Sequence, residues 1–295
     1  MTTLEGLVKE FVADTKARGL SPRTTLFYSA TLEKFMAFLK TRDVTGLEGL
    51  DARIVREYMG HCMTFLAPGG THARLRAVRA FVGFLMAEEL LTVNPFSRVK
   101  LPRVPEKPLD VVSDDQYRAL MTVAATAHNS LRDQAILSVM FDTGIRSGEL
   151  CAVLLEDVLR AEGGITIRQG KGGKVRFVPV CRGVLKRINQ YVTLERGKSA
   201  DSHLFFTRAN EPLRYEGLRM MLDRHCTTAG IKPIRPHAFR RGFAVAYVRN
   251  GGDVFTLQRI LGHTTLAMSS RYARMNSADV KDVHTRVSPV ARGGS

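Results

Sequence analysis

The sequence predicts a mainly α-helical protein of two domains, with a small β-sheet in the second domain. Apolar residues recur at helical spacing through most of the chain, and one pair of segments is rich in β-branched residues. A proline-rich stretch follows roughly the first 90 residues. The length of 295 residues also exceeds the usual single domain of about 100–200 residues, which favours two domains.

Residues 1–92 are predicted to form a small helical bundle that binds DNA. A first helix starts near Leu4, and Ser21-Pro22 offers an N-cap and a first-turn proline for a second. A third is expected from Asp51 and a fourth after Pro68-Gly69-Gly70. Their apolar stripes are Leu4, Leu7, Val8, Phe11 and Val12; Tyr28, Leu32, Phe35 and Leu39; Ile54, Tyr58, Cys62 and Phe65; and Leu75, Val78, Val82 and Leu85.

Residues 93–112 are predicted to be a linker, because four of the 11 prolines fall between Asn94 and Pro108. The second domain is then residues 113–295. Its first helix is signalled by the capping-box pattern Ser113-Asp114-Asp115-Gln116, and it carries Tyr117, Leu120, Met121 and Ala124 inward.

The next helices place one arginine on a tight turn. A helix with Ile136, Leu137 and Met140 is expected to stop at Gly144. Another is expected to begin near Ser147, with Leu150, Val153 and Leu154 inward. Arg146 therefore lies between two buried helices.

The predicted sheet is a β-hairpin of residues 165–168 and 175–180, around a glycine-rich turn with Lys171 at its tip. Further helices are expected over residues 184–196, 214–229, 238–249 and 253–261. Gly251-Gly252 and Gly262 are the expected breaks between them.

The charge predicts a polyanionic partner. The chain has 44 Lys and Arg against 28 Asp and Glu, a net charge of +16, with a pI near 10.1. Both parts share the excess, with 16 basic against 11 acidic residues up to Lys107 and 28 against 17 after it. A solvated basic surface would look the same by composition alone, but nucleic acid is the favoured interpretation.

Other features exclude several classes of protein. The four cysteines are scattered without a Cys-x-x-Cys spacing, and no third ligand stands at a matching spacing beside His237 and His263, so no metal and no cofactor are expected. No apolar run is long enough to span a membrane, and no secretory signal opens the chain. We expect a cytoplasmic, nucleoid-associated protein with no membrane partner.

Six residues are of the types that cutting a DNA strand with a tyrosine would require. They occur in the segments Thr143-Gly144-Ile145-Arg146, Gly170-Lys171-Gly172, His237-Ala238-Phe239-Arg240, Leu261-Gly262-His263 and Arg271-Tyr272. Such a cut needs a nucleophile, positive charge for the phosphate, and a proton for the departing 5′ oxygen. Guanidinium groups suit the non-bridging phosphate oxygens, and a histidine exchanges protons near neutral pH.

Together these motifs resemble the tyrosine recombinase, or phage integrase, family, in its short two-domain, Xer-like form. The resemblance covers essentially the whole chain. It implies Arg146, Lys171, His237, Arg240 and His263 as catalytic residues and Tyr272 as the nucleophile, joined transiently to the 3′ phosphate without ATP. Lys174 is the alternative to Lys171 for the catalytic role, but its position favours a contact with a backbone phosphate. The resemblance also implies a C-shaped clamp around DNA, exchange through a Holliday junction, and a homotetramer on two duplexes.

Further DNA contacts are expected from the basic residues Arg74, Arg76 and Arg79 of the fourth helix, with Arg241 beside the second catalytic arginine. A solvent-facing basic helix is the plain alternative. The C-terminal segment from Asp279 to His284 is either a frayed end or, as in the family, a tail that docks on a neighbouring protomer.

The chain departs from common family patterns at Phe239, Arg241, Gly242 and Arg274, none of which is a predicted catalytic position. These departures suggest a task other than that of the Xer-type chromosome-dimer resolvases. Two rival functions stay open at this point, a type IB topoisomerase and a DNA-binding accessory protein without chemistry. The recognition sequence and the choice among integration, excision, resolution and transposition cannot be inferred from the sequence.

Overall fold

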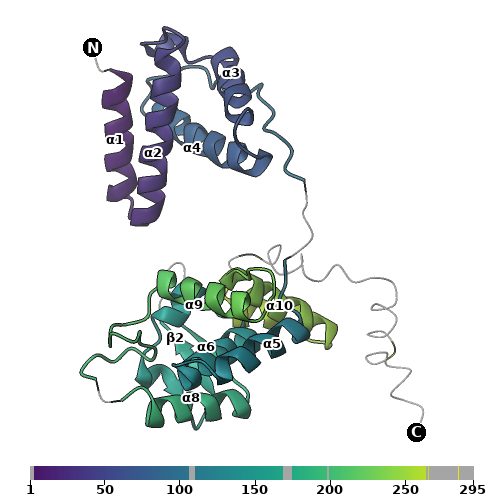
Figure 1. The fold of residues 1–295 in the computed structure, drawn as a ribbon. Coiled ribbons are helices and arrows are strands. Elements are labelled where there is room, and N and C mark those ends of the chain that lie inside the picture. The colour runs from purple at the N-terminus through teal and green to yellow at the C-terminus, as the bar shows by residue number, and fades with distance from the viewer. Residues whose placement is uncertain are drawn as a thin grey trace. The chain divides into compact units, whose positions relative to one another are not determined.

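A computed structural model describes residues 3–105, 110–168, 175–197, 199–263, 265 and 285. The chain divides into two compact units, Met1–Lys107 and Pro108–Ser295, here the N-terminal and C-terminal units (Figure 1). Each has its own hydrophobic core. Both are mainly helical and the C-terminal unit holds a small antiparallel sheet, which confirms the predicted fold class.

The N-terminal unit consists of helices whose starts follow from their capping residues. They are α1 (Leu4–Ala17), α2 (Pro22–Lys40), α3 (Ala52–Met63) and α4 (Pro68–Ala87), with a 3-10 turn at Leu47–Gly49. The side chains of Thr3, Ser21 and Asp51 accept the first free backbone N–H groups of α1, α2 and α3. Helix α4 begins at Pro68, so Gly69 and Gly70 lie inside its first turn rather than before it.

The predicted apolar stripes form the core of this unit, with one exception. Phe65 was expected to face inward, but α3 ends at Met63 and the Phe65 side chain is 52% exposed. The prediction was wrong because helical spacing has no meaning beyond the end of the helix. Phe96 and Val99, within the stretch predicted as a linker, are buried in the same core.

The C-terminal unit is built around helix α6. Its helices are α5 (Asp114–Ala125), α6 (Ser130–Thr143), α7 (Ser147–Cys151), α8 (Arg182–Leu194), α9 (Tyr215–Thr228), α10 (Pro236–Arg249) and α11 (Val254–Leu261). Helix α6 contacts α5, α8 and α10 and is buried on most of its circumference. The capping box of Ser113 and Gln116 is confirmed. Helix α7 is shorter than predicted, because Val153 and Leu154 lie beyond its end.

The sheet brings one strand against the end of α11. Its strands in the described part of the chain are β1 (Val158–Leu159), β2 (Gly164–Ile167) and β3 (Arg176–Pro179), paired antiparallel in that order. The predicted β2–β3 hairpin is confirmed, with Ile167 opposite Arg176. Strand β1 was not predicted, since two residues carry no periodic signal. Strand β3 also contacts α11.

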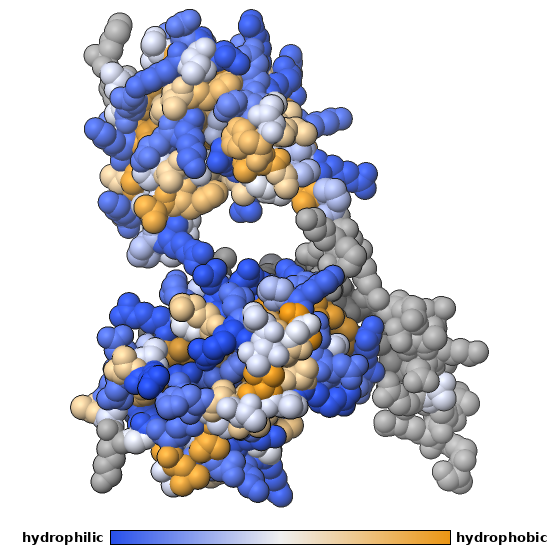
Figure 2. Space-filling view, viewed as in Figure 1, coloured by the Kyte–Doolittle hydropathy of each residue, from blue (hydrophilic) through white to orange (hydrophobic). Residues whose placement is uncertain are grey.

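The polarity of one face of each unit can be followed in a space-filling view (Figure 2). The face seen in Figure 2 is largely hydrophilic over each unit, with separate apolar groups between the polar ones. Within the described residues, no helix combines the length and the apolar composition that crossing a bilayer requires.

Candidate active site

Arg146 lies on the turn between α6 and α7, as the sequence predicts. Helix α6 ends at Gly144, whose φ of 59° is left-handed, and a Cβ there would lie 2.7 Å from the Phe243 ring. Arg146 is then the N-cap residue of α7. Its Nη1 donates to Glu149 Oε1 at 2.8 Å, and its side chain keeps 29% exposure. The turn therefore presents a partly exposed guanidinium.

Arg240, on α10, is the second predicted arginine and is only 2% exposed. Its Nη1 donates to the Gly144 carbonyl oxygen at 2.9 Å and its Nη2 to that of Leu261 at 2.7 Å. These carbonyls end α6 and α11, where the helix dipoles place partial negative charge. Two helix ends thus hold the buried guanidinium in place.

Arg176, on β3, is a third arginine at this place, and no motif in the sequence singles it out. Its Nε donates to the Ile260 carbonyl oxygen at 2.9 Å. Its Nη1 and Nη2 donate to the two carboxylate oxygens of Glu149 at 2.9 and 2.7 Å. The fork of Arg176 therefore ties β3 to both α7 and α11.

All three arginines donate hydrogen bonds to the C-terminal end of α11. The consecutive carbonyls of Ile260, Leu261 and Gly262 each accept a hydrogen bond from a different arginine. For Gly262 the donor is Arg146 Nη2, at 2.9 Å. Carbonyls at a helix end otherwise lack partners within the helix. The end of α11 thus gathers three positive charges from three separate elements, directly before His263.

Glu149 is the acidic member of the cluster. Its side chain is 4% exposed, and burial by itself would raise its pKa. The hydrogen bonds from Arg176 and Arg146 outweigh burial and hold the pKa of Glu149 below its ordinary value. The carboxylate stays ionised and offsets one of the three positive charges, so the cluster keeps a positive excess.

The two predicted histidines border this cluster. His263 follows Gly262 and is 9% exposed. Burial, then the charges of Arg240, Arg146 and Arg176, lower its pKa to about 4. His237, in the first turn of α10, has a lowered pKa from partial desolvation and then from the charges of Arg241 and Arg240. Both imidazoles are therefore mainly neutral near pH 7 in the absence of a phosphate.

The remaining predicted residues of the site, Lys171, Lys174 and Tyr272, lie outside the described residues, as does Arg274. The strands that flank the Lys171 turn are described, and β3 carries Arg176 next to Glu149. No group of three His, Cys, Asp or Glu side chains that could hold a metal ion occurs in the described part of the chain.

The predicted DNA-binding arginines of α4 differ in their surroundings. Arg74 stacks on the Phe65 ring, with its guanidinium carbon 5.1 Å from the ring centroid, and Arg79 stacks on Phe96 at 5.0 Å. Arg76 is exposed. Aromatic partners hold two of the three cations in place, while Arg76 extends into solvent.

Comparison with known proteins identifies the family. Residues 110–279 match the model of the phage integrase family, and residues 8–89 match the phage integrase N-terminal SAM-like domain. The chain belongs to the phage integrase family. It is therefore a tyrosine recombinase, and the resemblance found in the sequence is confirmed.

Curated relatives of this integrase-family chain include recombinases of the Xer type. Tyrosine recombinase XerC of Pelobacter propionicus is 29% identical over 93% of this chain and 92% of its own. Tyrosine recombinase XerD of Staphylococcus epidermidis is 26% identical over 93% and 95%. These names give no support to the expectation of a task different from that of the Xer resolvases.

Solved structures share the fold. The XerA recombinase is 26% identical, with a TM-score of 0.54 over 96% of this chain and 98% of its own. The Tn1549 transposon integrase, solved with a circular intermediate DNA, has a TM-score of 0.77 over 95% and 99% at 16% identity. A lambda integrase dimer bound to a core site has a TM-score of 0.72 at 18% identity. These last two show likeness of fold alone.

Proposed function

We propose that this chain is a site-specific recombinase that cuts and rejoins DNA through a transient bond between Tyr272 and a 3′ phosphate, without ATP. The observation that carries this proposal is the cluster at the end of α11. Arg146, Arg176 and Arg240 donate to three consecutive carbonyls there, directly before His263. Fixed positive charge of this kind suits a phosphate whose negative charge grows in the transition state.

The arginines have different parts in this scheme. Arg146 is partly exposed and would meet the non-bridging oxygens of the scissile phosphate. Arg240 is nearly enclosed, so it would contribute a charge that needs no reorganisation when the phosphate arrives. Arg176 would not act on DNA itself. It would be a positioning residue, because it fixes Glu149 and the end of α11.

The proton transfers would fall to the remaining residues. The Tyr272 oxygen forms a bond to phosphorus while the bond from phosphorus to the 5′ oxygen breaks. His237, which is exposed and mainly neutral near pH 7, would accept the phenol proton, and Lys171 would give a proton to the departing 5′ oxygen. His263 would donate a hydrogen bond to the phosphate as a neutral ring. Rejoining reverses these transfers, so neither water nor ATP is consumed.

The wider assembly follows from the same proposal. Double-stranded DNA is the partner, with Arg74, Arg76, Arg79, Lys174 and Arg241 as backbone contacts. Exchange of strand pairs through a Holliday junction would need a homotetramer on two duplexes, acting on cytoplasmic DNA in the nucleoid. The predicted boundaries, residues 1–92, 93–112 and 113–295, would separate DNA binding, linker and catalysis. No observation favours either the topoisomerase or the inactive accessory protein.

A trapping experiment on random DNA tests the proposal, and it does not require the recognition sequence to be identified first. The full chain is incubated with nicked duplexes of randomised sequence, and DNA linked covalently to protein is recovered after denaturation in detergent. The wild type should yield adducts that share a sequence, and Tyr272→Phe should yield none. Tyr215→Phe, at an exposed tyrosine of α9, is the matched control and should behave as wild type. Adducts on Tyr272→Phe would refute the assigned nucleophile.

A further inference from the structure

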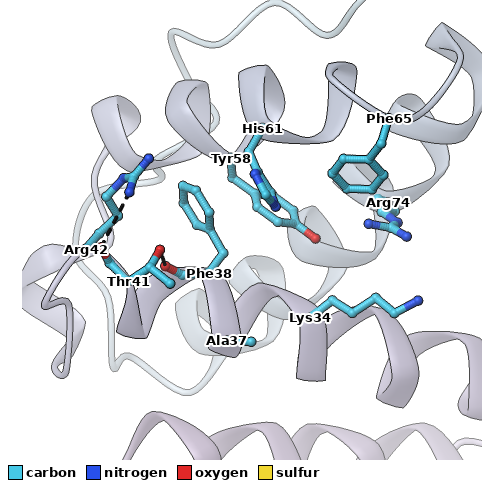
Figure 3. Close-up of a pocket in the computed structure, with 9 residues that line it drawn as sticks. All are labelled: Lys34, Ala37, Phe38, Thr41, Arg42, Tyr58, His61, Phe65 and Arg74. Atoms are coloured by element: carbon cyan, nitrogen blue, oxygen red, sulfur yellow. Dashed lines mark hydrogen bonds between the residues drawn. The ribbon is translucent and has the colours of Figure 1, made fainter.

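The N-terminal unit contains a pocket that the recombination scheme does not use. It encloses about 580 Å³ between α2, α3 and the start of α4 (Figure 3). Phe38, Tyr58, His61 and Phe65 form its aromatic wall, and Lys34 and Arg74 supply cationic ends. This volume is within the range of pockets that bind small organic ligands. Neither Asp nor Glu is among the described residues that line it.

The aromatic wall is an ordered set of rings. Phe38 and His61 stack with their centroids 5.2 Å apart, and His61 meets Phe65 edge to face at 5.2 Å. His61 and Phe65 are the exposed members, so both offer ring surface to a ligand. Exposed aromatic rings beside fixed cations are the usual surface for stacking nucleobases.

The cations of the pocket differ in their availability. Arg42 lies over the Phe38 ring at 5.1 Å and donates to Glu57 Oε2 at 3.1 Å, so its charge is already partnered. Lys34 lines the pocket, and no Asp or Glu is among the described residues that line it with Lys34. Arg74 is fixed over Phe65. Figure 3 shows the ends of Lys34 and Arg74 on the side to which the Tyr58 hydroxyl points. Two cations therefore remain for an anionic group.

The Tyr58 hydroxyl is the second sign of a ligand. Tyr58 is 1% exposed, and its hydroxyl makes no hydrogen bond of good geometry among the described residues, although Cys62 and Arg74 lie beside it. Buried polar atoms of this kind are rare in proteins. Burial, and then the neighbouring Cys62 thiol, raises the pKa of Tyr58, so the hydroxyl keeps its proton and is able to donate. Arg74 lines the same pocket beside this hydroxyl, so an anionic oxygen bound by Arg74 can also accept from Tyr58 (Figure 3).

We propose that this pocket binds one nucleotide unit, with the base on His61 and Phe65 and the phosphate held by Lys34, Arg74 and the Tyr58 hydroxyl. The ligand must combine a planar aromatic body with an anionic group, and a nucleotide does so in one unit. As a source we favour an unpaired nucleotide of the DNA, which rests on the proposed function because strand exchange separates base pairs.

Binding of single-stranded DNA tests the pocket separately from catalysis. The full chain with Tyr272→Phe, which blocks strand cleavage under the proposed function, is titrated into fluorescent oligothymidine, and anisotropy reports the affinity. Phe65→Ala should weaken binding by about 5-fold or more, the loss expected for one stacked base. Tyr58→Phe keeps the buried ring but removes the hydroxyl, and it should weaken oligothymidine binding several-fold. Phe27→Ala, an exposed aromatic of α2 outside the pocket, is the control and should change nothing.

Two further measurements identify the source of the bound nucleotide and show whether the proposal fails. Competition by free thymidine monophosphate would support a free nucleotide as the ligand, and resistance to it would support the DNA strand. The proposal is overturned if Phe65→Ala and Tyr58→Phe bind oligothymidine like Phe27→Ala. It is also overturned if both variants weaken duplex binding equally. Adduct formation by these variants with Tyr272 intact reports on the proposed function alone, so the two failures are distinguishable.

Discussion

The site strongly alters the ionisation of His263. Its pKa falls from 6.5 to about 4, through burial and then through the charges of Arg240, Arg146 and Arg176. The imidazole of His263 therefore binds a proton more readily in the unfolded chain than in the folded chain. The contribution of neutral His263 to stability is fully present above pH 6.5 and is lost as the pH falls towards 4.

Replacement of His263 should reduce this pH dependence. We expect His263→Gln to flatten the rise in the free energy of unfolding between pH 4 and 6.5, because its amide does not titrate in this range. Urea unfolding of the C-terminal unit at several pH values measures the slope. His128→Gln, at an exposed loop histidine, is the control and should keep the wild-type slope. An unchanged slope in His263→Gln would contradict the assigned cause.

Arg176 should matter for both stability and cleavage, although no DNA contact is assigned to it. Arg176→Ala leaves the buried Glu149 carboxylate with Arg146 as its ion-pair partner, and loss of a buried partner costs about 3–5 kcal/mol. Arg176→Lys keeps the charge but loses the two-pronged hydrogen bond, so it should recover only part of the adduct yield. Thermal unfolding and the trapping assay measure the two effects.

The control for Arg176 is another arginine of the same unit. Arg182→Ala, at the exposed start of α8, should leave adduct yield and unfolding temperature near wild type. If Arg176→Ala were as stable and as active as Arg182→Ala, the positioning role would be wrong. A loss of stability with normal cleavage would leave Arg176 as a structural residue only.

The sequence could indicate Arg146, Arg240 and His263 because each lies in a short local motif. It could not indicate Arg176 or the role of Glu149. The partners of Arg176 are 27 and 84 residues away along the chain, so only the folded structure brings them together. The same reason explains why sequence alone could not show that the three arginines share the end of α11. Lys171 and Tyr272 stay predictions.

At the scale of the element, the turn after α6 sets the position of two arginines. Gly144 ends α6 in a left-handed conformation, and its carbonyl accepts from Arg240. Two residues later Arg146 starts α7. A side chain at position 144 would meet Phe243 at 2.7 Å and Leu261 at 3.0 Å. The close approach of α10 and α11 to this turn therefore requires glycine.

Gly144→Ala should lower the free energy of unfolding by about 1–3 kcal/mol, through backbone strain and overpacking. It should lower the adduct yield further, since Arg146 and Arg240 shift with the turn. Gly148→Ala, in α7, is the matched control, because nothing lies within 4 Å of its Cβ position. It should be neutral or slightly stabilising. Equal stability of the two variants, compared by thermal unfolding, would show that the turn tolerates a side chain.

The elements that sequence analysis predicted well are those whose signals are local. Ser21-Pro22, the capping box at Ser113 and the break at Gly262 all fall where the structure has them. The predictions that failed also have physical causes. Phe65 continued a periodic pattern past the end of its helix, and β1 is held by pairing with β2 rather than by its own two residues. Such outcomes depend on tertiary contacts.

At the scale of the whole molecule, positive charge is distributed over both units. The basic excess is present before and after Lys107, and the catalytic cluster uses only a few of the 44 basic residues. Basic side chains outside the cluster can attract the phosphate backbone without regard to its sequence. Binding to duplex DNA should therefore weaken steeply as salt rises, because each neutralised phosphate releases bound counterions.

Arg76 offers the clearest test of this contribution, because Arg74 and Arg79 also pack on aromatic rings. Removal of its charge should weaken duplex binding to all sequences alike and lower the slope of log affinity against log salt by about 1. Anisotropy titrations of Arg76→Ala at several salt concentrations measure the slope. Arg18→Ala, which removes an exposed arginine paired with Asp14, is the control and should keep the wild-type slope. If the slopes of Arg76→Ala and wild type were the same, α4 would not lie on the phosphate backbone, and the basic excess of the N-terminal unit would act through other residues.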